Sequence, residues 1–194
     1  MTPTPLWSAA VLCGGASRRM GTDKALVAVD GVPMLRRVAV ALRRAAACQV
    51  ACVGSADSAG THARRRGALA GLQVVAVDDD HPGEGPLGGI LTALRTAPED
   101  IEVVLVVACD LLVPSPSAFA ATVAALGEGD VAVPQGTEWL HAAWHRRAEP
   151  VLAKQFAAGE RAVHRAVTGL DVVVVDIDPM ACRDADVPED LPLS

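Results

Sequence analysis

A glycine-rich loop with several basic side chains follows the first apolar run of the sequence. Cys13–Gly15 places two glycines side by side, and Arg18, Arg19 and Lys24 follow on the same loop. Adjacent glycines let the backbone turn sharply and present N–H groups to a ligand, and the cationic side chains bind phosphate oxygens. The loop is therefore suited to a polyphosphate, although it matches neither the Walker A pattern nor G-x-G-x-x-G.

A single acidic residue, Asp110, ends the apolar run 103–109. A carboxylate at the tip of a buried strand needs a cation or a hydrogen-bonding partner, because an isolated buried charge is costly. Magnesium binds one or two protein carboxylates together with substrate phosphates, so one aspartate suffices for a site. Taken alone, Asp110 can also be a turn or helix-capping residue, but beside a phosphate-binding loop it predicts a magnesium–nucleotide site.

Length and composition limit the classes of protein to consider. The chain has 194 residues, of which 51% are hydrophobic and 3% aromatic, so a disordered or fibrous protein is excluded and an aliphatic core is expected. Its formal charge of −6 argues against a nucleic-acid partner. No apolar run approaches the about 18 residues of a membrane helix, and no secretory signal is recognised. Five scattered cysteines without a C-x-x-C pair favour the reducing cytoplasm.

The elements that must position the loop and Asp110 alternate between strands and helices. Short β-branched runs predict strands at about 7–12, 50–54, 72–77, 103–108, 130–133 and 172–176. Helices are expected from Pro33, over 88–95, from the cap Ser115 to about Leu126, and from Pro150 to Gly159. This alternation is typical of a mostly parallel, doubly wound sheet in a three-layer α/β/α fold. Ligands bind such sheets at the carboxyl ends of the strands.

The loop sequence resembles the signature of one enzyme family. From Leu12 to Lys24 the chain reads L-C-G-G-A-S-R-R-M-G-T-D-K, which is similar to the L-x-G-G-x-S-x-R-M-G-x-D-K motif of nucleotidyltransferases of the molybdenum cofactor guanylyltransferase type. Further segments match in the order of that family, so the resemblance covers about residues 7–191. It implies a Rossmann-like domain that transfers a nucleoside monophosphate from an NTP to a phosphate-bearing acceptor.

The resemblance implies roles for residues in the first half of the chain. Arg19, Lys24 and Asp110 would be catalytic, with Asp110 as the magnesium ligand. Of three consecutive acids after the third strand, Asp78 best matches the family's nucleotide-contacting aspartate, and Asp79 and Asp80 are expected to be solvated. The nucleotide-binding residues implied in this way are Leu12, Cys13, Gly14, Gly15, Lys24, Asp78 and Asp110.

The second half resembles the family's acceptor-binding segments, with departures. Gly159 and Arg161 match a G-x-R segment that helps to hold the acceptor. Asp184 and Asp186 stand where the family has two asparagines. A carboxylate cannot donate the hydrogen bonds of an amide, so these residues would hold a metal or a different acceptor. We expect one domain over 1–194, with about 6–114 binding the nucleotide and about 115–191 the acceptor.

Two other segments are interpreted as structural. The run 139–145 matches a strand that lies beside the acceptor in relatives, and we expect its tryptophans in the core and its histidines at the rim. His141 and His145 lack the intervening glutamate of an H-E-x-x-H zinc motif. The run Arg64–Arg66 is interpreted as surface charge.

The reaction that the resemblance implies is attack of an acceptor phosphate oxygen on the α-phosphorus of GTP, with Mg²⁺ as cofactor and molybdenum-molybdopterin as acceptor. CTP or another NTP, and another small phosphorylated acceptor, remain open, because the strand end at Val53 lacks an asparagine that helps to bind guanine in some relatives. A non-catalytic nucleotide-binding module is a further alternative, and a nicotinamide-dependent oxidoreductase is excluded by the missing glycine fingerprint. Expected partners are the NTP, a phosphorylated pterin-type acceptor, and molybdoenzymes or their chaperones.

Overall fold

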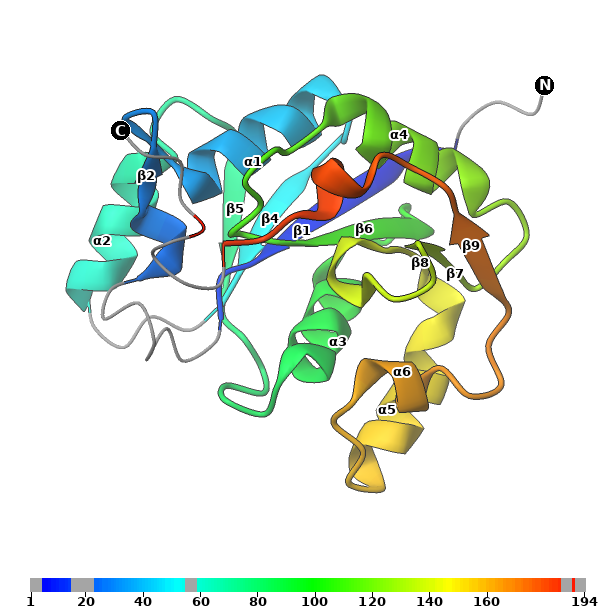
Figure 1. Ribbon diagram of the computed structural model, residues 1–194. Helices are drawn as coiled ribbons and strands as arrows, with labels where there is room; N and C mark the ends of the chain where they lie inside the picture. The colour runs from blue at the N-terminus through cyan, green and yellow to red at the C-terminus, as the bar shows by residue number, and fades with distance from the viewer. Residues whose placement is uncertain (1–4, 15–22, 55–58, 186–189, 191–194) are drawn as a thin grey trace.

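The computed structural model describes residues 5–14, 23–54, 59–185 and 190. Within these ranges, seven strands form one sheet with helices against both of its faces (Figure 1). The strands are β1 (Trp7–Leu12), β4 (Val50–Val53), β5 (Val74–Val77), β6 (Val103–Ala108), β7 (Val131–Pro134), β8 (Ala143–His145) and β9 (Val172–Val175). Their order across the sheet is β5-β4-β1-β6-β8-β7-β9, and of these strands only β8 is antiparallel to its neighbours.

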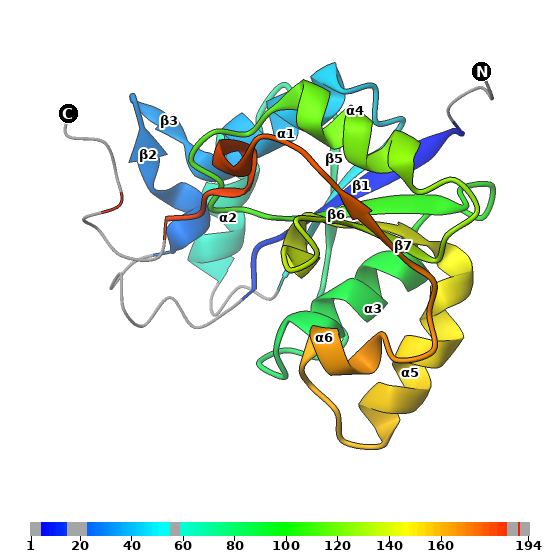
Figure 2. The same cartoon turned by 45° about the vertical axis from the view of Figure 1, so that its right-hand side comes forward.

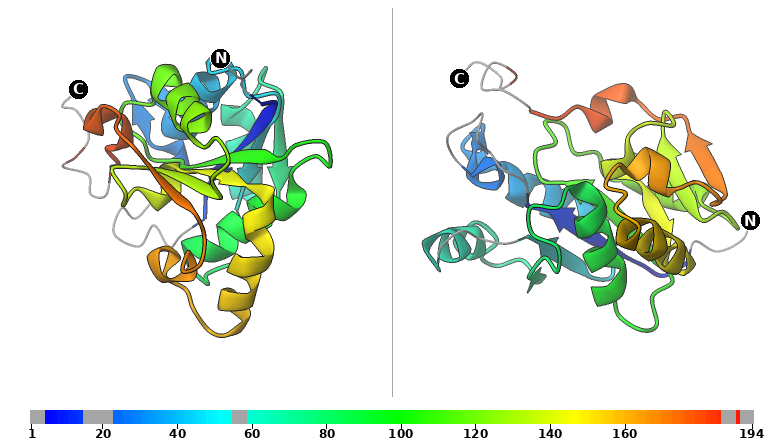
Figure 3. Two further views of the ribbon diagram at one scale, coloured as in Figure 1. Left: turned by 90° about the vertical axis from the view of Figure 1, so that its right-hand side faces the viewer. Right: turned by 90° about the horizontal axis from the view of Figure 1, so that it is seen from below.

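The helices form the two outer layers. Helices α1 (Met34–Arg44) and α4 (Pro116–Ala125) cover one face of the sheet, and α3 (Pro86–Thr96), α5 (Glu149–Ala157) and α6 (Val163–Ala166) cover the other (Figures 2 and 3). Helix α2 (Ala59–Ala68) contacts α1. The mostly parallel, three-layer α/β/α fold predicted from the sequence is confirmed. No helix in the described ranges is long and apolar enough to cross a membrane.

The central strand β6 shows how one apolar run serves two packed faces. Successive side chains of a strand point to opposite faces. Val103, Leu105 and Val107 pack in the cluster that contains the apolar residues of α1 and α4, whereas Val104 and Val106 pack in the cluster of α3 and α5. A strand buried on both faces must be apolar throughout. The polar Asp110 interrupts this apolar stretch directly after the strand, between the buried Cys109 and Leu111.

The helix starts that the sequence predicts are present. Helix α1 begins directly after Pro33, and its residues Leu35, Val38 and Leu42 are fully buried at three- and four-residue steps. Helix α4 begins at Pro116 after Ser115, whose Oγ accepts a hydrogen bond from the Ala118 N–H at 3.3 Å. Such a cap satisfies a backbone donor that the helix itself leaves unpaired.

Three local structures differ from the prediction or were absent from it. A short antiparallel pair, β2 (Ala28–Val29) and β3 (Val32–Pro33), precedes α1, and its turn places Asp30 and Gly31 at φ of 52° and 75°. Helix α2 lacks the buried stripe by which a helix is recognised in sequence. The predicted strand over 139–145 is wrong in its first half, since Trp139–His141 form a 3-10 turn and only Ala143–His145 join the sheet.

Candidate active site

A cleft of about 470 Å³ lies at the carboxyl ends of the parallel strands, within the range of small-molecule sites. Cys13 and Gly14 line it after β1, and Cys109 and Asp110 line it after β6. The loop after β5 and the start of α3 form another wall of this cleft. This is the edge at which ligands bind in open α/β sheets.

Lys24 and Asp110 meet in this cleft. Lys24 begins the 3-10 turn Lys24–Leu26, and its Nζ lies 3.0 Å from Oδ2 of Asp110. The two side chains are 19% and 15% exposed, so the pair is largely shielded from solvent. Burial and the negative charge of Asp184 raise the pKa of Asp110, and the Lys24 ammonium opposes this increase. The predicted convergence of these two residues is thus present in the structure.

A later segment of the chain places a second carboxylate, that of Asp184, close to Asp110. Asp184 forms an antiparallel bridge with Leu111, and the Ala185 N–H donates to the Asp110 carbonyl at 3.0 Å. The Asp184 carboxylate in turn lies 3.2 Å from Nε2 of His141. His141 is 3% exposed, so its predicted position at the rim is wrong. The 3-10 turn that replaces the predicted strand directs this histidine inward.

The acidic side of the cleft fits a hard divalent cation. The Asp110 carboxylate is largely shielded from solvent and close enough to Asp184 for the second charge to raise its pKa, and a bound cation relieves such repulsion. Carboxylate oxygens are the ligands that magnesium prefers. The described residues contain no group of three or more histidine, cysteine or acidic side chains that can hold a metal. Magnesium usually completes its ligand set with phosphate oxygens and water, so one or two carboxylates such as those of Asp110 and Asp184 suffice on the protein side.

The acidic residue that lines the cleft after β5 is Asp79. Its Oδ1 accepts hydrogen bonds from the His81 N–H at 3.0 Å and from Thr92 Oγ1 at 3.2 Å. The interpretation of Asp79 as a solvated loop residue is therefore wrong. Asp78 is exposed and is not among the residues that line the cleft. The structure thus places Asp79, and not Asp78, among the residues that line the cleft.

The N-terminus of α3 also faces the cleft. Gly85 and Pro86 line the cavity, and Gly85, at φ 87°, precedes a helix that has no side-chain cap. A helix N-terminus of this kind attracts anions through its unpaired N–H groups. Close packing sets the position of α3, since a Cβ on Gly88 would lie 2.7 Å from Cβ of His81. The segment Gly85–Gly89 is thus a closely packed part of the wall.

Arg65 was missed as a site residue because it lies in an arginine run. Its Nε donates to Asp23 Oδ2 at 2.8 Å and its Nη2 to the Cys13 carbonyl at 2.8 Å, and its side chain is 13% exposed. Asp23 and Cys13 both line the cleft. The interpretation of Arg64–Arg66 as surface charge is correct for the exposed Arg64 and Arg66 but wrong for Arg65. Arg65 differs from Arg64 and Arg66 through its contacts with Asp23 and Cys13, which are distant in sequence.

The predicted acceptor residues Gly159 and Arg161, which follow α5, are not among the residues that line the cleft. The Arg161 guanidinium lies 3.8 Å from the ring centroid of Phe156 and forms an ion pair with Glu84. Glu84 belongs to the turn whose glycines line the cavity. Gly159 follows α5 at φ 95° and does not line the cleft. Gly15, Arg19 and Asp186 lie outside the described residues.

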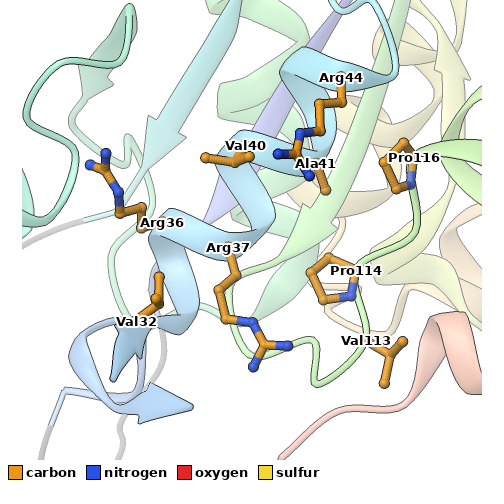
Figure 4. A pocket seen from close by; sticks show the side chains of 9 residues that line it. All are labelled: Val32, Arg36, Arg37, Val40, Ala41, Arg44, Val113, Pro114 and Pro116. Atoms are coloured by element: carbon orange, nitrogen blue, oxygen red, sulfur yellow. The ribbon is translucent and has the colours of Figure 1, made fainter. Parts of the chain in front are cut away.

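A second cavity, of about 290 Å³, lies between α1 and the loop at 113–116. In Figure 4, Arg37 and Arg44 extend from α1 on the side of Pro114, whereas Arg36 points away from it. Arg37 Nη2 donates to the Leu112 carbonyl at 3.0 Å. The described residues that line this cavity include no carboxylate. It therefore does not share the paired cationic and acidic groups of the cleft at Asp110.

The sheet, the loop after β1 and the acidic residue after β6 define a Rossmann-like nucleotidyltransferase. Residues 9–172 match the family model of the MobA-like NTP transferase domain, and the chain belongs to this family. It is 32% identical to a probable molybdenum cofactor guanylyltransferase of Methanothermobacter thermautotrophicus, over 95% of this chain and 96% of the relative. It is 30% identical to the molybdenum cofactor guanylyltransferase of Pseudomonas entomophila, over 95% of this chain and 92% of the relative.

Solved structures show the same fold at lower sequence identity. Molybdopterin-guanine dinucleotide biosynthesis protein A from Archaeoglobus fulgidus superposes with a TM-score of 0.73, at 23% identity and over 94% of each chain. A 4-diphosphocytidyl-2C-methyl-D-erythritol synthase from Anaerococcus prevotii superposes with a TM-score of 0.75, at 13% identity, over 95% of this chain and 92% of the other. The fold is thus shared by proteins whose names indicate different acceptors.

Proposed function

We propose that this protein transfers GMP from GTP to the molybdenum-molybdopterin cofactor and releases pyrophosphate. The observation that carries the proposal is the Lys24–Asp110 pair, which lies at 3.0 Å in a cleft at the carboxyl edge of the sheet. The full-length similarity to relatives named molybdenum cofactor guanylyltransferase supports the choice of donor and acceptor. The reaction would take place in the cytoplasm, with molybdoenzymes or their chaperones as receivers of the product.

The chemistry asks the protein for positioning and charge neutralisation more than for covalent steps. An oxygen of the acceptor phosphate forms a bond with the α-phosphorus of GTP. The bond from that phosphorus to the bridging oxygen breaks, and pyrophosphate leaves with its electron pair. The acceptor phosphate is already anionic at neutral pH, so the proposal includes no general base.

Each side of the cleft has a role in this proposal. Gly14 and the residues beside it would bind the phosphates through backbone N–H groups, as would the N-terminus of α3. Lys24 would neutralise the triphosphate near the α-phosphate. Asp79 would contact the nucleoside. Asp110, with Asp184 beside it, would hold Mg²⁺, which supplies charge neutralisation of the phosphate oxygens when bound.

The acceptor would enter from the side formed by the second half of the chain. Residues of about 115–191 would bind it, and residues of about 6–114 would bind the nucleotide. Among the predicted acceptor residues, Arg161 is the one with a cationic side chain, and it pairs with Glu84 beside the cleft. Asp184 has a carboxylate where an amide is expected. Asp184 would therefore help to hold the metal rather than contact the pterin.

CTP is the second candidate donor. The strand end at Val53 and Gly54 offers the cleft no side-chain amide for a guanine base, and the fold is shared with a protein named for a cytidyl product. Both candidates use the same phosphate site, because the base lies outside the Lys24–Asp110 region. Only a direct comparison of nucleotides separates them.

The experiment is a measurement of pyrophosphate release with GTP, CTP, UTP and ATP, each with molybdenum-molybdopterin and with and without Mg²⁺. Release that requires Mg²⁺ and the acceptor, and that is fastest with GTP, is the expected result. Preference for CTP would replace the donor but keep the reaction. Tight GTP binding without any release would indicate a non-catalytic nucleotide-binding protein instead.

A further inference from the structure

Helix α2 contributes one largely shielded side chain, that of Arg65, which contacts two residues that line the cleft. From its contacts we propose that Arg65 is a positioning residue for nucleotidyl transfer, because it holds the two ends of the phosphate-binding loop in a fixed relation. The inference rests on the proposed function, since the loop is taken to bind the triphosphate. It concerns a residue that has no place in the loop motif itself.

One guanidinium group joins Cys13, near the start of the loop, to Asp23, near its end. Nε of Arg65 donates to Asp23 Oδ2 at 2.8 Å, and Nη2 donates to Asp23 Oδ1 at 3.1 Å. The same Nη2 donates to the Cys13 carbonyl at 2.8 Å. The planar fork of arginine suits this bidentate arrangement, which lysine cannot reproduce. With side chains only 13% and 14% exposed, the ion pair is better shielded than an ordinary surface pair.

The contact between Arg65 and Asp23 also affects the position of Lys24, because Asp23 caps the turn that contains Lys24. Asp23 is the N-cap of the 3-10 turn Lys24–Leu26, and its Oδ1 accepts a hydrogen bond from the Ala25 N–H at 3.2 Å. Arg65 therefore fixes the carboxylate that begins this turn. The turn carries Lys24, whose Nζ reaches Asp110 at 3.0 Å. Loss of Arg65 releases the cap and with it the position of the catalytic ammonium.

The contact with Cys13 orients the first N–H group of the loop. A peptide group is planar and trans, so the carbonyl of Cys13 and the N–H of Gly14 point in opposite directions. Because the carbonyl points to Arg65, the Gly14 N–H points away from it. Gly54 packs closely against this peptide, since a Cβ there would lie 2.9 Å from the Cys13 carbonyl carbon. Arg65 on one side and Gly54 on another thus hold the peptide that presents the donor.

Steady-state kinetics test the proposal against a purely structural role. We compare Arg65→Ala and Arg65→Lys with Arg66→Ala, a neighbour on the same helix that is exposed. Misplacing reactive groups by about 1 Å costs up to about 10²-fold, so Arg65→Ala should lower kcat/KM for the nucleotide at least about 10-fold, through both kcat and KM. Arg65→Lys should recover only part of this, and added guanidinium ion at low millimolar concentration should partly restore Arg65→Ala. Arg66→Ala should match the wild type.

Each of these variants is assayed at a temperature where circular dichroism shows it fully folded. Activity of Arg65→Ala within twofold of the wild type would overturn the proposal. The proposal would also be overturned if Arg65→Lys had full wild-type activity, or if the activity of Arg65→Ala fell only in proportion to its fraction of folded protein. A wild-type protein that releases no pyrophosphate would overturn the proposed function. The positioning role of Arg65 is then tested by a second measurement that needs neither metal nor nucleotide.

That measurement is amide hydrogen exchange of the protein without ligand. The Ala25 N–H donates a hydrogen bond to Asp23, whose carboxylate accepts one from Arg65. Arg65→Ala should raise the exchange rate of the Ala25 amide at least about 10-fold, a loss of roughly 1.4 kcal/mol of local protection. Core amides of β6 should stay unchanged in the same variant. Unchanged exchange at Ala25 would remove the link from Arg65 to Lys24, whatever the activity of the protein.

Discussion

The Nζ of Lys24 lies 3.0 Å from Oδ2 of Asp110, although 86 positions separate the two residues in the chain. The parallel sheet makes this contact, because β1 and β6 are neighbours and their carboxyl ends meet at one edge. The ammonium balances part of the charge that Asp110 brings into a buried position. In the proposed function, the phosphates of a bound nucleotide would be a second partner for Lys24, and Asp110 would then be available to hold a divalent cation.

The first prediction concerns this pair. Lys24→Ala and Asp110→Ala should each lower kcat by about 10²-fold or more, because each removes a preorganised protein charge that would stabilise the transition state. Pyrophosphate release with the preferred nucleotide and acceptor measures the effect. Lys154→Ala and Asp100→Ala change exposed residues of the same types and should leave kcat unchanged. Near-native turnover of either cleft variant would remove that residue from the mechanism.

The second prediction concerns stability. Because burial and Asp184 raise the pKa of Asp110 above 3.8, the ionised carboxylate costs folding free energy at neutral pH. Asp110→Asn should therefore raise the Tm of the metal-free protein at pH 7 by at least about 1 °C. The native state binds the proton more tightly, so the advantage of the variant should shrink as the pH falls through the raised pKa towards 3.8. Calorimetry over this pH range gives the answer, and a lower Tm at pH 7 would contradict it.

The third prediction uses the neighbour of Asp110. Removing the negative charge of Asp184 by Asp184→Asn should lower the pKa of Asp110, since Asp184 is one cause of its increase. Activity should be lost on the acid side when Asp110 is protonated. The acid limb of the pH–rate profile should therefore move to lower pH in Asp184→Asn. An unchanged limb would show that another group controls it.

The fourth prediction separates two adjacent acids. Asp79 lines the cleft and Asp78 is exposed. Asp79→Ala should raise KM for the nucleotide about 10-fold with a smaller change in kcat, as expected for a binding contact. The corresponding change in Asp78→Ala should be smaller. A larger effect at Asp78 would restore the assignment made from the sequence.

The fifth prediction concerns thiol reactivity. Cys48 is exposed, and the other four cysteines are buried. Burial, together with the charges of Glu138 and Asp184, raises the pKa of Cys182 to about 12, so its thiol stays protonated. A disulfide reagent at pH 8 should modify one thiol quickly in the native protein and five after denaturation. Cys48→Ser should abolish the fast phase, and a second fast thiol in the native protein would contradict the packing around the cleft.

The sequence predicted those parts of the site that follow directly from the sheet. A strand recognised by its apolar run brings its next residue to the carboxyl edge, and for this reason Lys24 and Asp110 were correctly expected to meet. Asp79 was misread because the direction of a side chain after a strand depends on the loop and not on the run before it. His141 was misread because a 3-10 turn interrupts the expected alternation.

Arg65 shows a different limit. Helix α2 is mostly exposed, so its sequence has little apolar periodicity to mark it as a helix. Three consecutive arginines look equivalent in sequence, but successive helix positions point in different directions. Only the middle one reaches Asp23. No local pattern identifies such a contact, because the partner lies 42 positions earlier in the chain.

The bridge between Leu111 and Asp184 has a consequence for how the protein is made. Chains emerge from the ribosome with the N-terminal side first and begin to fold during synthesis. Lys24 and Asp110 are therefore available early, whereas Asp184 reaches them only after β9 has been translated. A nascent chain that ends before Asp184 therefore lacks the second carboxylate beside Asp110. Of the described residues discussed for the site, Asp184 is the last to be synthesised.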